Sequence, residues 1–153
     1  MACRFRPAVC RRGMWDIEHS WATAPTWLWP PHPPSVTPRN YQAAGVEYAL
    51  ARDNCIFGDE PGLGKSGQCV MTGNAIEAKR SLIVAPASLR LNWEREVWMW
   101  SMIENVKTQV ILKAKDGVAP WAHYVITSYD MLRNEALLDA LLGEYWDLSL
   151  IHI

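Results

Sequence analysis

The stretch Gly-Asp-Glu-Pro-Gly-Leu-Gly-Lys-Ser, residues 58–66, decides how the rest of the chain is interpreted. A phosphate-binding loop needs glycines that let backbone N–H groups turn towards anionic oxygens. It also needs a lysine for the terminal phosphates and a hydroxyl on the next residue for Mg²⁺. The residues that supply these groups are Gly62, Gly64, Lys65 and Ser66. Asp59 stands where the general Gly-x4-Gly-Lys-Ser/Thr pattern has its first glycine. Taken alone, the stretch fits either a phosphate-binding loop or a tight glycine-rich turn that caps a helix.

The segments on either side of the loop predict a strand and a helix. Residues 54–57 are a short, mostly apolar run suited to a buried strand. Residues 65–80 can form a helix whose N-terminal dipole favours a bound phosphate. Within that helix, Gly67 and Gly73 each cost about 1 kcal/mol relative to alanine. Ligands of parallel sheets bind at the carboxyl ends of strands, so a loop that follows a strand favours nucleotide binding over a simple turn.

The composition is that of a globular domain of 153 residues, 50% hydrophobic and 20% charged. A net charge of −1 argues neither for nor against nucleic acid, because a local basic groove can lie in a neutral chain. No run of 18 apolar residues is present, and the N-terminal arginines lack the apolar core of a secretion signal. The four cysteines, Cys3, Cys10, Cys55 and Cys69, match no zinc-module spacing. Cys55 and Cys69 lie in the predicted strand and helix around the loop and are expected to be buried free thiols, which fits a reducing setting and favours the cytoplasm.

Residues 1–36 differ from the rest and predict a Trp/Pro-rich extension or linker. Five prolines lie between residues 30 and 38 and preclude a helix there. The tryptophans of this segment either form an aromatic binding patch or pack onto the domain; they are Trp15, Trp21, Trp27 and Trp29. Thr37 as N-cap and Pro38 as first helical residue then predict a helix that runs to about Arg52.

After the loop helix, strands and helices alternate. Strands are predicted at 81–84, which Ala85-Pro86 stops, at 106–112 and at 124–127. An apolar stripe that begins at Ser88 and Leu89 predicts a helix containing Trp93, Val97 and Trp100. A second helix is expected from Ser128 to Gly143. This alternation predicts an α/β fold with a mostly parallel sheet covered by helices on both faces.

Four blocks of sequence resemble the first ATPase lobe of the Swi/Snf-type DNA translocases, in helicase superfamily two. The blocks are Arg-Asn-Tyr-Gln at 39–42, Asp-Glu-Pro-Gly-Leu-Gly-Lys-Ser-Gly-Gln at 59–68, the segment 82–96 and Val-Ile-Thr-Ser-Tyr-Asp-Met-Leu at 125–132. The resemblance covers about residues 37–147 and accounts for Asp59, because this family habitually has aspartate there. It implies a RecA-like P-loop NTPase lobe, with ATP and Mg²⁺ as cofactors and double-stranded DNA as the partner of the full-length protein.

The resemblance also implies a role for individual residues. Gln42 is similar to the glutamine that reads adenine, Lys65 and Ser66 to the catalytic pair, and Ser66 to the residue that binds Mg²⁺. The implied nucleotide-binding residues are Gln42, Asp59, Glu60, Pro61, Gly62, Leu63, Gly64, Lys65 and Ser66. The implied contacts to the DNA backbone are Pro86, Ser88, Leu89, Thr127 and Ser128.

Some of these residues have a second interpretation or depart from the family. Ser88 and Ser128 are also good helix N-caps, and capping alone would explain both. Pro61 and Ser66 stand where the family more often has Met and Thr, and neither removes a needed chemical group. Gly67 replaces a larger residue and is expected to loosen the start of the helix.

The end of the sequence leads to a separate expectation. In-line hydrolysis needs an acidic pair, which the family carries on the strand after a Trp-Asp such as 146–147. Residues 148–153 read Leu-Ser-Leu-Ile-His-Ile instead, which is the translation of a transposon end used in preparing DNA sequencing libraries. We therefore interpret 37–147 as a partial lobe, truncated before the Asp-Glu strand, and 148–153 as adapter read-through. The alternative is a genuine strand.

The sequence thus predicts an ATP-binding fragment of an ATP-dependent DNA translocase or helicase. On this interpretation the chain alone does not hydrolyse ATP, and its source is a bacterial or phage-infected cell. Two alternatives stay open: a non-catalytic nucleotide-binding module, and a P-loop ATPase unrelated to nucleic acid.

Overall fold

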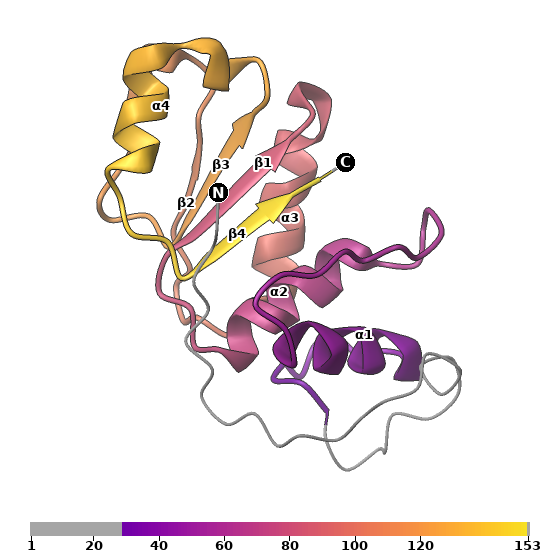
Figure 1. Cartoon of the computed structure of the whole chain (residues 1–153). Helices are drawn as coiled ribbons and strands as arrows, with labels where there is room; N and C mark the ends of the chain where they lie inside the picture. Colours follow the sequence, from indigo (N-terminus) through magenta and orange to yellow (C-terminus); the bar gives the residue numbers. More distant parts are fainter. Residues whose placement is uncertain (1–28, 153) are drawn as a thin grey trace.

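A computed structural model describes residues 29–152 of the chain. Its centre is a four-stranded sheet in the order β2-β3-β1-β4 (Figure 1). Every neighbouring pair is parallel, with Ser81 opposite both Tyr124 and Leu148. The strands are β1 Ser81–Ala85, β2 Thr108–Val110, β3 Tyr124–Ser128 and β4 Leu148–Ile151. The helices are α1 Asn40–Leu50, α2 Lys65–Ala75, α3 Arg90–Trp100 and α4 Glu135–Leu142. Single 3₁₀ turns are η2 Ala87–Leu89, η3 Ala114–Asp116 and η4 Met131–Arg133.

Helices cover both faces of this sheet, which confirms the predicted architecture. On one face, Val70 of α2 and Trp93 and Val97 of α3 pack on alternate residues of β1, β3 and β4. On the other face, Leu137 and Leu141 of α4 pack against β3 and the segment after β2. Successive side chains of a strand point to opposite faces, so the short apolar strands contribute side chains to the packing on both faces of the sheet. In the described part of the chain, no helix is long and apolar enough to cross a membrane.

The helix α1 lies on the outside of α2 and begins later than the sequence predicts. Its N-cap is Arg39 rather than Thr37, so the prediction of Pro38 as the first helical residue is wrong. The prolines at 30–34 are non-helical, as predicted. The Oε1 atom of Gln42 accepts a hydrogen bond from the Arg39 backbone N–H at 2.8 Å. A side chain from inside the helix thus provides the acceptor for the backbone N–H of the N-cap residue. Residues Trp15, Trp21 and Trp27 of the predicted extension lie outside the described residues.

The predicted strand at 54–57 is wrong. These residues form no regular element, and Ile56 is 78% exposed. A strand needs a hydrogen-bonded neighbour, and none of the four strands of the sheet pairs with residues 54–57. The predicted helix at 65–80 is also too long: α2 ends at Ala75, and Glu77 has a left-handed φ of 54°. The strand predicted at 106–112 is shorter, at Thr108–Val110.

The capping interpretation of two serines is also wrong. Ser88 lies inside the turn η2, and α3 begins after Leu89 without a side-chain cap. Ser128 is the last residue of β3, and α4 is capped instead by Asn134, whose Oδ1 accepts from the Leu137 N–H at 3.0 Å. Asparagine is as good an N-cap as serine, so the pattern alone placed the helix start six residues early.

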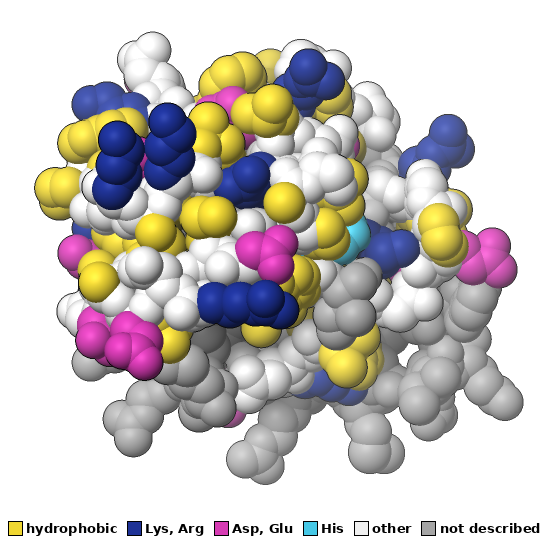
Figure 2. Space-filling model, turned by 90° about the horizontal axis from the view of Figure 1, so that it is seen from above, with side chains coloured by type: hydrophobic (Ala, Val, Ile, Leu, Met, Phe, Trp, Pro, Cys, Tyr) yellow, Lys and Arg dark blue, Asp and Glu magenta, His cyan; other side chains and the backbone are white. Residues whose placement is uncertain are grey.

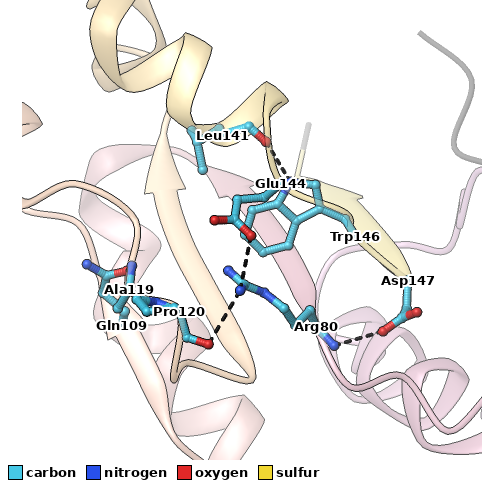
Figure 3. A network of polar contacts seen from close by, with 8 residues as sticks. All are labelled: Arg80, Gln109, Ala119, Pro120, Leu141, Glu144, Trp146 and Asp147. Carbon is cyan, nitrogen blue, oxygen red and sulfur yellow. Dashed lines mark hydrogen bonds and ion pairs between the residues drawn. The ribbon is translucent and has the colours of Figure 1, made fainter.

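A polar network fixes the amino-terminal edge of the sheet, away from the loop at 58–66 (Figure 3). The Asp147 carboxylate accepts from the backbone N–H groups of Lys79 and Arg80, both at 2.9 Å. Arg80 forms a 3.1 Å ion pair with Glu144 and lies over the ring of Trp146. These contacts hold the entries to β1 and β4 side by side. Residues 148–151 form β4; the adapter origin of 148–153 stays a prediction, because a strand here does not test where its codons came from.

Candidate nucleotide-binding site

The loop at 58–66 has the backbone shape that its glycines predict. Gly62 and Gly64 have φ values of +86° and +72°, in the left-handed region that side chains with a Cβ rarely adopt. Gly64 is also the N-cap of α2, so the first N–H groups of that helix face the loop. Residues 58–63 are exposed. An exposed loop that ends on a helix N-terminus is well suited to an anion.

Lys65 is the first residue of α2, and its side chain turns back over the loop. Its Nζ donates to the carbonyl oxygens of Asp59 at 2.7 Å and Glu60 at 3.0 Å. The ammonium group thus lies within the loop's curve, where terminal phosphates would be held if the loop binds them. Ser66 is partly buried beside it, in the first turn of α2.

Gln42 reaches the opposite end of the loop from α1. Its Nε2 lies 3.4 Å from the carbonyl oxygens of Leu63 and Gly64, which makes both hydrogen bonds long. A Cβ on Gly64 would lie 2.4 Å from that same Nε2 atom. Glycine at this position therefore satisfies two demands, a left-handed φ and the close approach of α1. The structure brings Gln42 and the loop together, as the sequence predicted.

Four residues that pack around the loop and the start of α2 were not among the predicted site residues. Gln68, on α2, is fully buried and donates from Nε2 to the Asp59 carboxylate at 2.7 Å. A Cβ on Gly45 would lie 2.0 Å from the Gln68 Oε1 atom, so α1 packs directly on this side chain. A Cβ on Gly67 would lie 2.7 Å from the indole of Trp100, which fills the space that a larger residue would take. The Gln68 motif position was visible in the sequence, but its contacts were not.

The thiols beside the loop are free, as predicted for the described cysteines. Cys55 and Cys69 form no disulfide and are partly buried. Burial raises the pKa of the Cys69 thiol to about 12; Cys55 raises that pKa further, and the charge of Lys65 lowers it. Burial also raises the pKa of Cys55, with Arg52 opposing. Both groups are therefore neutral thiols at neutral pH, which makes them poor nucleophiles.

The two segments predicted to contact DNA lie side by side at the carboxyl edge of the sheet. Ala85, just before Pro86, is opposite Ser128, and Val84 is opposite Thr127. Ser88 is exposed, and Pro86 and Leu89 are partly buried. Thr127 and Ser128 are buried, and their hydroxyl oxygens have no hydrogen-bond partner among the described residues. The face in Figure 2 shows Lys and Arg interspersed with acidic and hydrophobic side chains rather than gathered in one patch. DNA contact by these residues stays a prediction.

The chain spans a tenth or less of the length of two curated relatives that it matches. It is 35% identical over 107 residues to the DNA annealing helicase and endonuclease ZRANB3 of Mus musculus, covering 66% of this chain and 10% of the relative. It is 39% identical over 95 residues to the Chromodomain-helicase-DNA-binding protein 8 of Danio rerio, covering 56% and 4%. Neither relative is bacterial or from a phage, so the predicted bacterial or phage source has no support from them.

A solved structure and a family model agree on the class of the domain. The fold is similar to a Sulfolobus solfataricus SWI2/SNF2 ATPase core in complex with dsDNA, with a TM-score of 0.59 and 21% identity. That similarity covers 76% of this chain and 26% of the solved one, and it supports the predicted RecA-like fold. Residues 41–151 match the family of the SNF2-related domain. Because this match covers well over half of the 153 residues, the chain belongs to the SNF2-related domain family.

Proposed function

We propose that residues 58–66 bind Mg-ATP and that the chain is the nucleotide-binding part of an ATP-dependent DNA translocase. The observation that carries the proposal is the loop itself: left-handed Gly62 and Gly64 lead into the N-terminus of α2, with the Lys65 ammonium inside the curve. This donor set suits a triphosphate, because it offers backbone N–H groups and one flexible cation.

Lys65, Ser66 and Gln42 have distinct roles in this proposal. Lys65 exchanges the carbonyl oxygens of Asp59 and Glu60 for the terminal phosphates of the nucleotide. Ser66 supplies the hydroxyl for Mg²⁺, and the bound metal supplies charge neutralisation at those phosphates. The bonds from Gln42 Nε2 to the loop are long, at 3.4 Å, so this donor can be given up to an acceptor on the adenine edge, while Oε1 keeps its 2.8 Å bond from the Arg39 N–H.

The proposal also places DNA contact at the carboxyl edge of the sheet. The solved SWI2/SNF2 core of similar fold is described in complex with dsDNA. In this chain the exposed hydroxyl of Ser88, two residues after Pro86, suits contact with a phosphate backbone, which carries no sequence information. Thr127 and Ser128 would take part only after a rearrangement that exposes them, since both are buried here.

Binding of a fluorescent ATP analogue with Mg²⁺ to the whole chain tests the proposal. Lys65→Ala should weaken binding by about 10-fold or more, because it removes a charged partner of the phosphates. Lys79→Ala is the matched control, since this exposed lysine lies beyond the far end of α2. Equal affinity of the wild-type chain and Lys65→Ala would contradict the assigned site.

A further inference from the structure

A hydrogen bond joins the fully buried side chain of Gln68 to Asp59 of the loop. Gln68 lies in the first turns of α2, with an exposed fraction of 0%, and its Nε2 donates to Asp59 Oδ2 at 2.7 Å. Its Oε1 is buried without a hydrogen-bond partner among the described residues. Burying an amide with one unsatisfied oxygen is costly, so a purely packing role is better filled by an apolar side chain.

The other side-chain hydrogen bonds to the loop differ in length and in whether they would persist when a nucleotide binds. Among the described residues, side-chain hydrogen bonds to 59–64 come from three residues: Gln42, Lys65 and Gln68. Those of Gln42 are long, and those of Lys65 hold the carbonyl oxygens of Asp59 and Glu60. If Lys65 turns to a phosphate, as the proposed function requires, Gln68 supplies the one side-chain hydrogen bond that remains at the start of the loop among the described residues.

The position of Gln68 is in turn set by α1. A Cβ on Gly45 would lie 2.0 Å from Oε1 and 3.0 Å from Cδ of Gln68, so only glycine allows this packing. Gly45 follows Gln42 by three residues, and both therefore lie on the same face of α1. That face contacts one end of the loop through Gln42 and the other end through Gln68.

We propose that Gln68 is a positioning residue, seated by Gly45 of α1, that fixes Asp59 and thereby keeps the phosphate loop in its binding shape. This rests on the proposed function of the loop. It adds that α1 and Gln68, neither of which supplies a phosphate ligand, determine how well the loop holds a nucleotide.

The main test replaces Gln68 by a side chain of the same length without a donor. Gln68→Met should weaken Mg-ATP binding by about tenfold, the equivalent of one hydrogen bond to a charged group. Gln109→Met is the matched control: it makes the same replacement on the edge strand β2, where the Gln109 side chain donates to Gly117 and accepts from Ala119. It should lower the melting temperature without changing the affinity for Mg-ATP.

Two further variants separate positioning from general destabilisation. Gly45→Ala should weaken Mg-ATP binding although alanine favours a helix more than glycine does. In a double-mutant cycle, the variant that combines Asp59→Ala with Gln68→Met should bind Mg-ATP no more weakly than the weaker-binding single variant. The reason is that both substitutions remove the same hydrogen bond. Fully additive losses would overturn the proposal.

Hydrogen exchange without nucleotide keeps the test independent of the proposed function. In Gln68→Met and Gly45→Ala, the backbone N–H groups of residues 59, 60 and 62–64 should exchange faster than in the wild-type chain. In Gln109→Met, exchange at these residues should be unchanged. If the wild-type chain fails to bind Mg-ATP but this pattern holds, the proposed function fails and the loop-positioning role stands. Unchanged exchange in residues 59–64, or an affinity for Mg-ATP equal to wild type in Gln68→Met, would overturn that role.

Discussion

The contact between Gly67 and Trp100 makes a prediction whose sign depends on one side chain. From helix propensity alone, Gly67→Ala should raise the free energy of unfolding by about 1 kcal/mol, because alanine is the better helix former. However, the new Cβ would lie 2.7 Å from Cε2, 3.0 Å from Nε1 and 3.1 Å from Cδ2 of Trp100. Overpacking of this kind costs about 1–3 kcal/mol, so the net change should be a destabilisation of up to about 2 kcal/mol.

Removing Trp100 should reverse that sign. Trp100 packs against the core cluster that α2 and α3 share, so Trp100→Ala is itself destabilising. In that background the atoms closest to the new Cβ are gone, and Gly67→Ala should then stabilise by about 1 kcal/mol. The free energy of unfolding in urea, followed by circular dichroism, measures all four chains. For a domain of this size the melting temperature should move by about 2–4 °C per kcal/mol.

The result that would refute this reasoning is an equal effect of Gly67→Ala in both backgrounds. It would mean that Trp100 does not occupy the space above Gly67. Stabilisation of the wild-type chain by Gly67→Ala would instead support the sequence-based expectation, namely that Gly67 merely loosens the start of α2.

Three further predictions concern the sheet edges and the pH dependence. Asp147→Ala should lower the free energy of unfolding by about 2 kcal/mol, because two backbone N–H groups lose a charged acceptor, whereas Glu144→Gln should cost under about 1 kcal/mol. Burial raises the pKa of Tyr124 from 10.0 to about 12. Between about pH 10 and 12 the unfolded state loses this proton while the folded state keeps it, so the free energy of unfolding should fall as pH rises; Tyr124→Phe should make that pH dependence flatter. Ser88→Ala should weaken binding of the chain to double-stranded DNA at low salt by about threefold, equally for different sequences.

Each of these has a clear contrary result. Equal costs for the two carboxylate variants in urea titrations would show that the pair of backbone contacts adds nothing beyond a surface ion pair. An unchanged alkaline slope in the phenylalanine variant, measured by unfolding between pH 9 and 12, would remove the tyrosine as its source. DNA affinity that depends on sequence, measured by fluorescence anisotropy, would argue against a contact to the phosphate backbone.

The strands that could be predicted are short apolar runs followed by a residue that ends a strand. The strands at 81–85 and 124–128 follow this rule, and Pro86 ends the first of them. The run at 54–57 has the same local signal but no strand beside it, and pairing is a tertiary property that a local pattern does not contain. Likewise Ser128 is a good N-cap in isolation, yet it ends β3 and Asn134 caps α4.

The candidate site divides in the same way. The glycines and Lys65 were predictable, because a phosphate loop dictates residue types at fixed spacing. The seating of Gln68 against Gly45 was not, since it depends on how α1 packs on α2. Nor was the burial of Thr127 and Ser128, which follows from their place in a central strand of the sheet.

The central claim is that the loop at 58–66 holds the phosphates of a nucleotide. The most direct measurement is a titration of the isotope-labelled chain with Mg-ATP, followed through the backbone N–H resonances by NMR. The account predicts that the largest shifts fall on Gly62, Gly64, Lys65 and Ser66, that Mg-ADP shifts the same resonances, and that adenosine does not. Saturable shifts centred on the amino-terminal edge around Arg80, or no shifts at millimolar Mg-ATP, would contradict it.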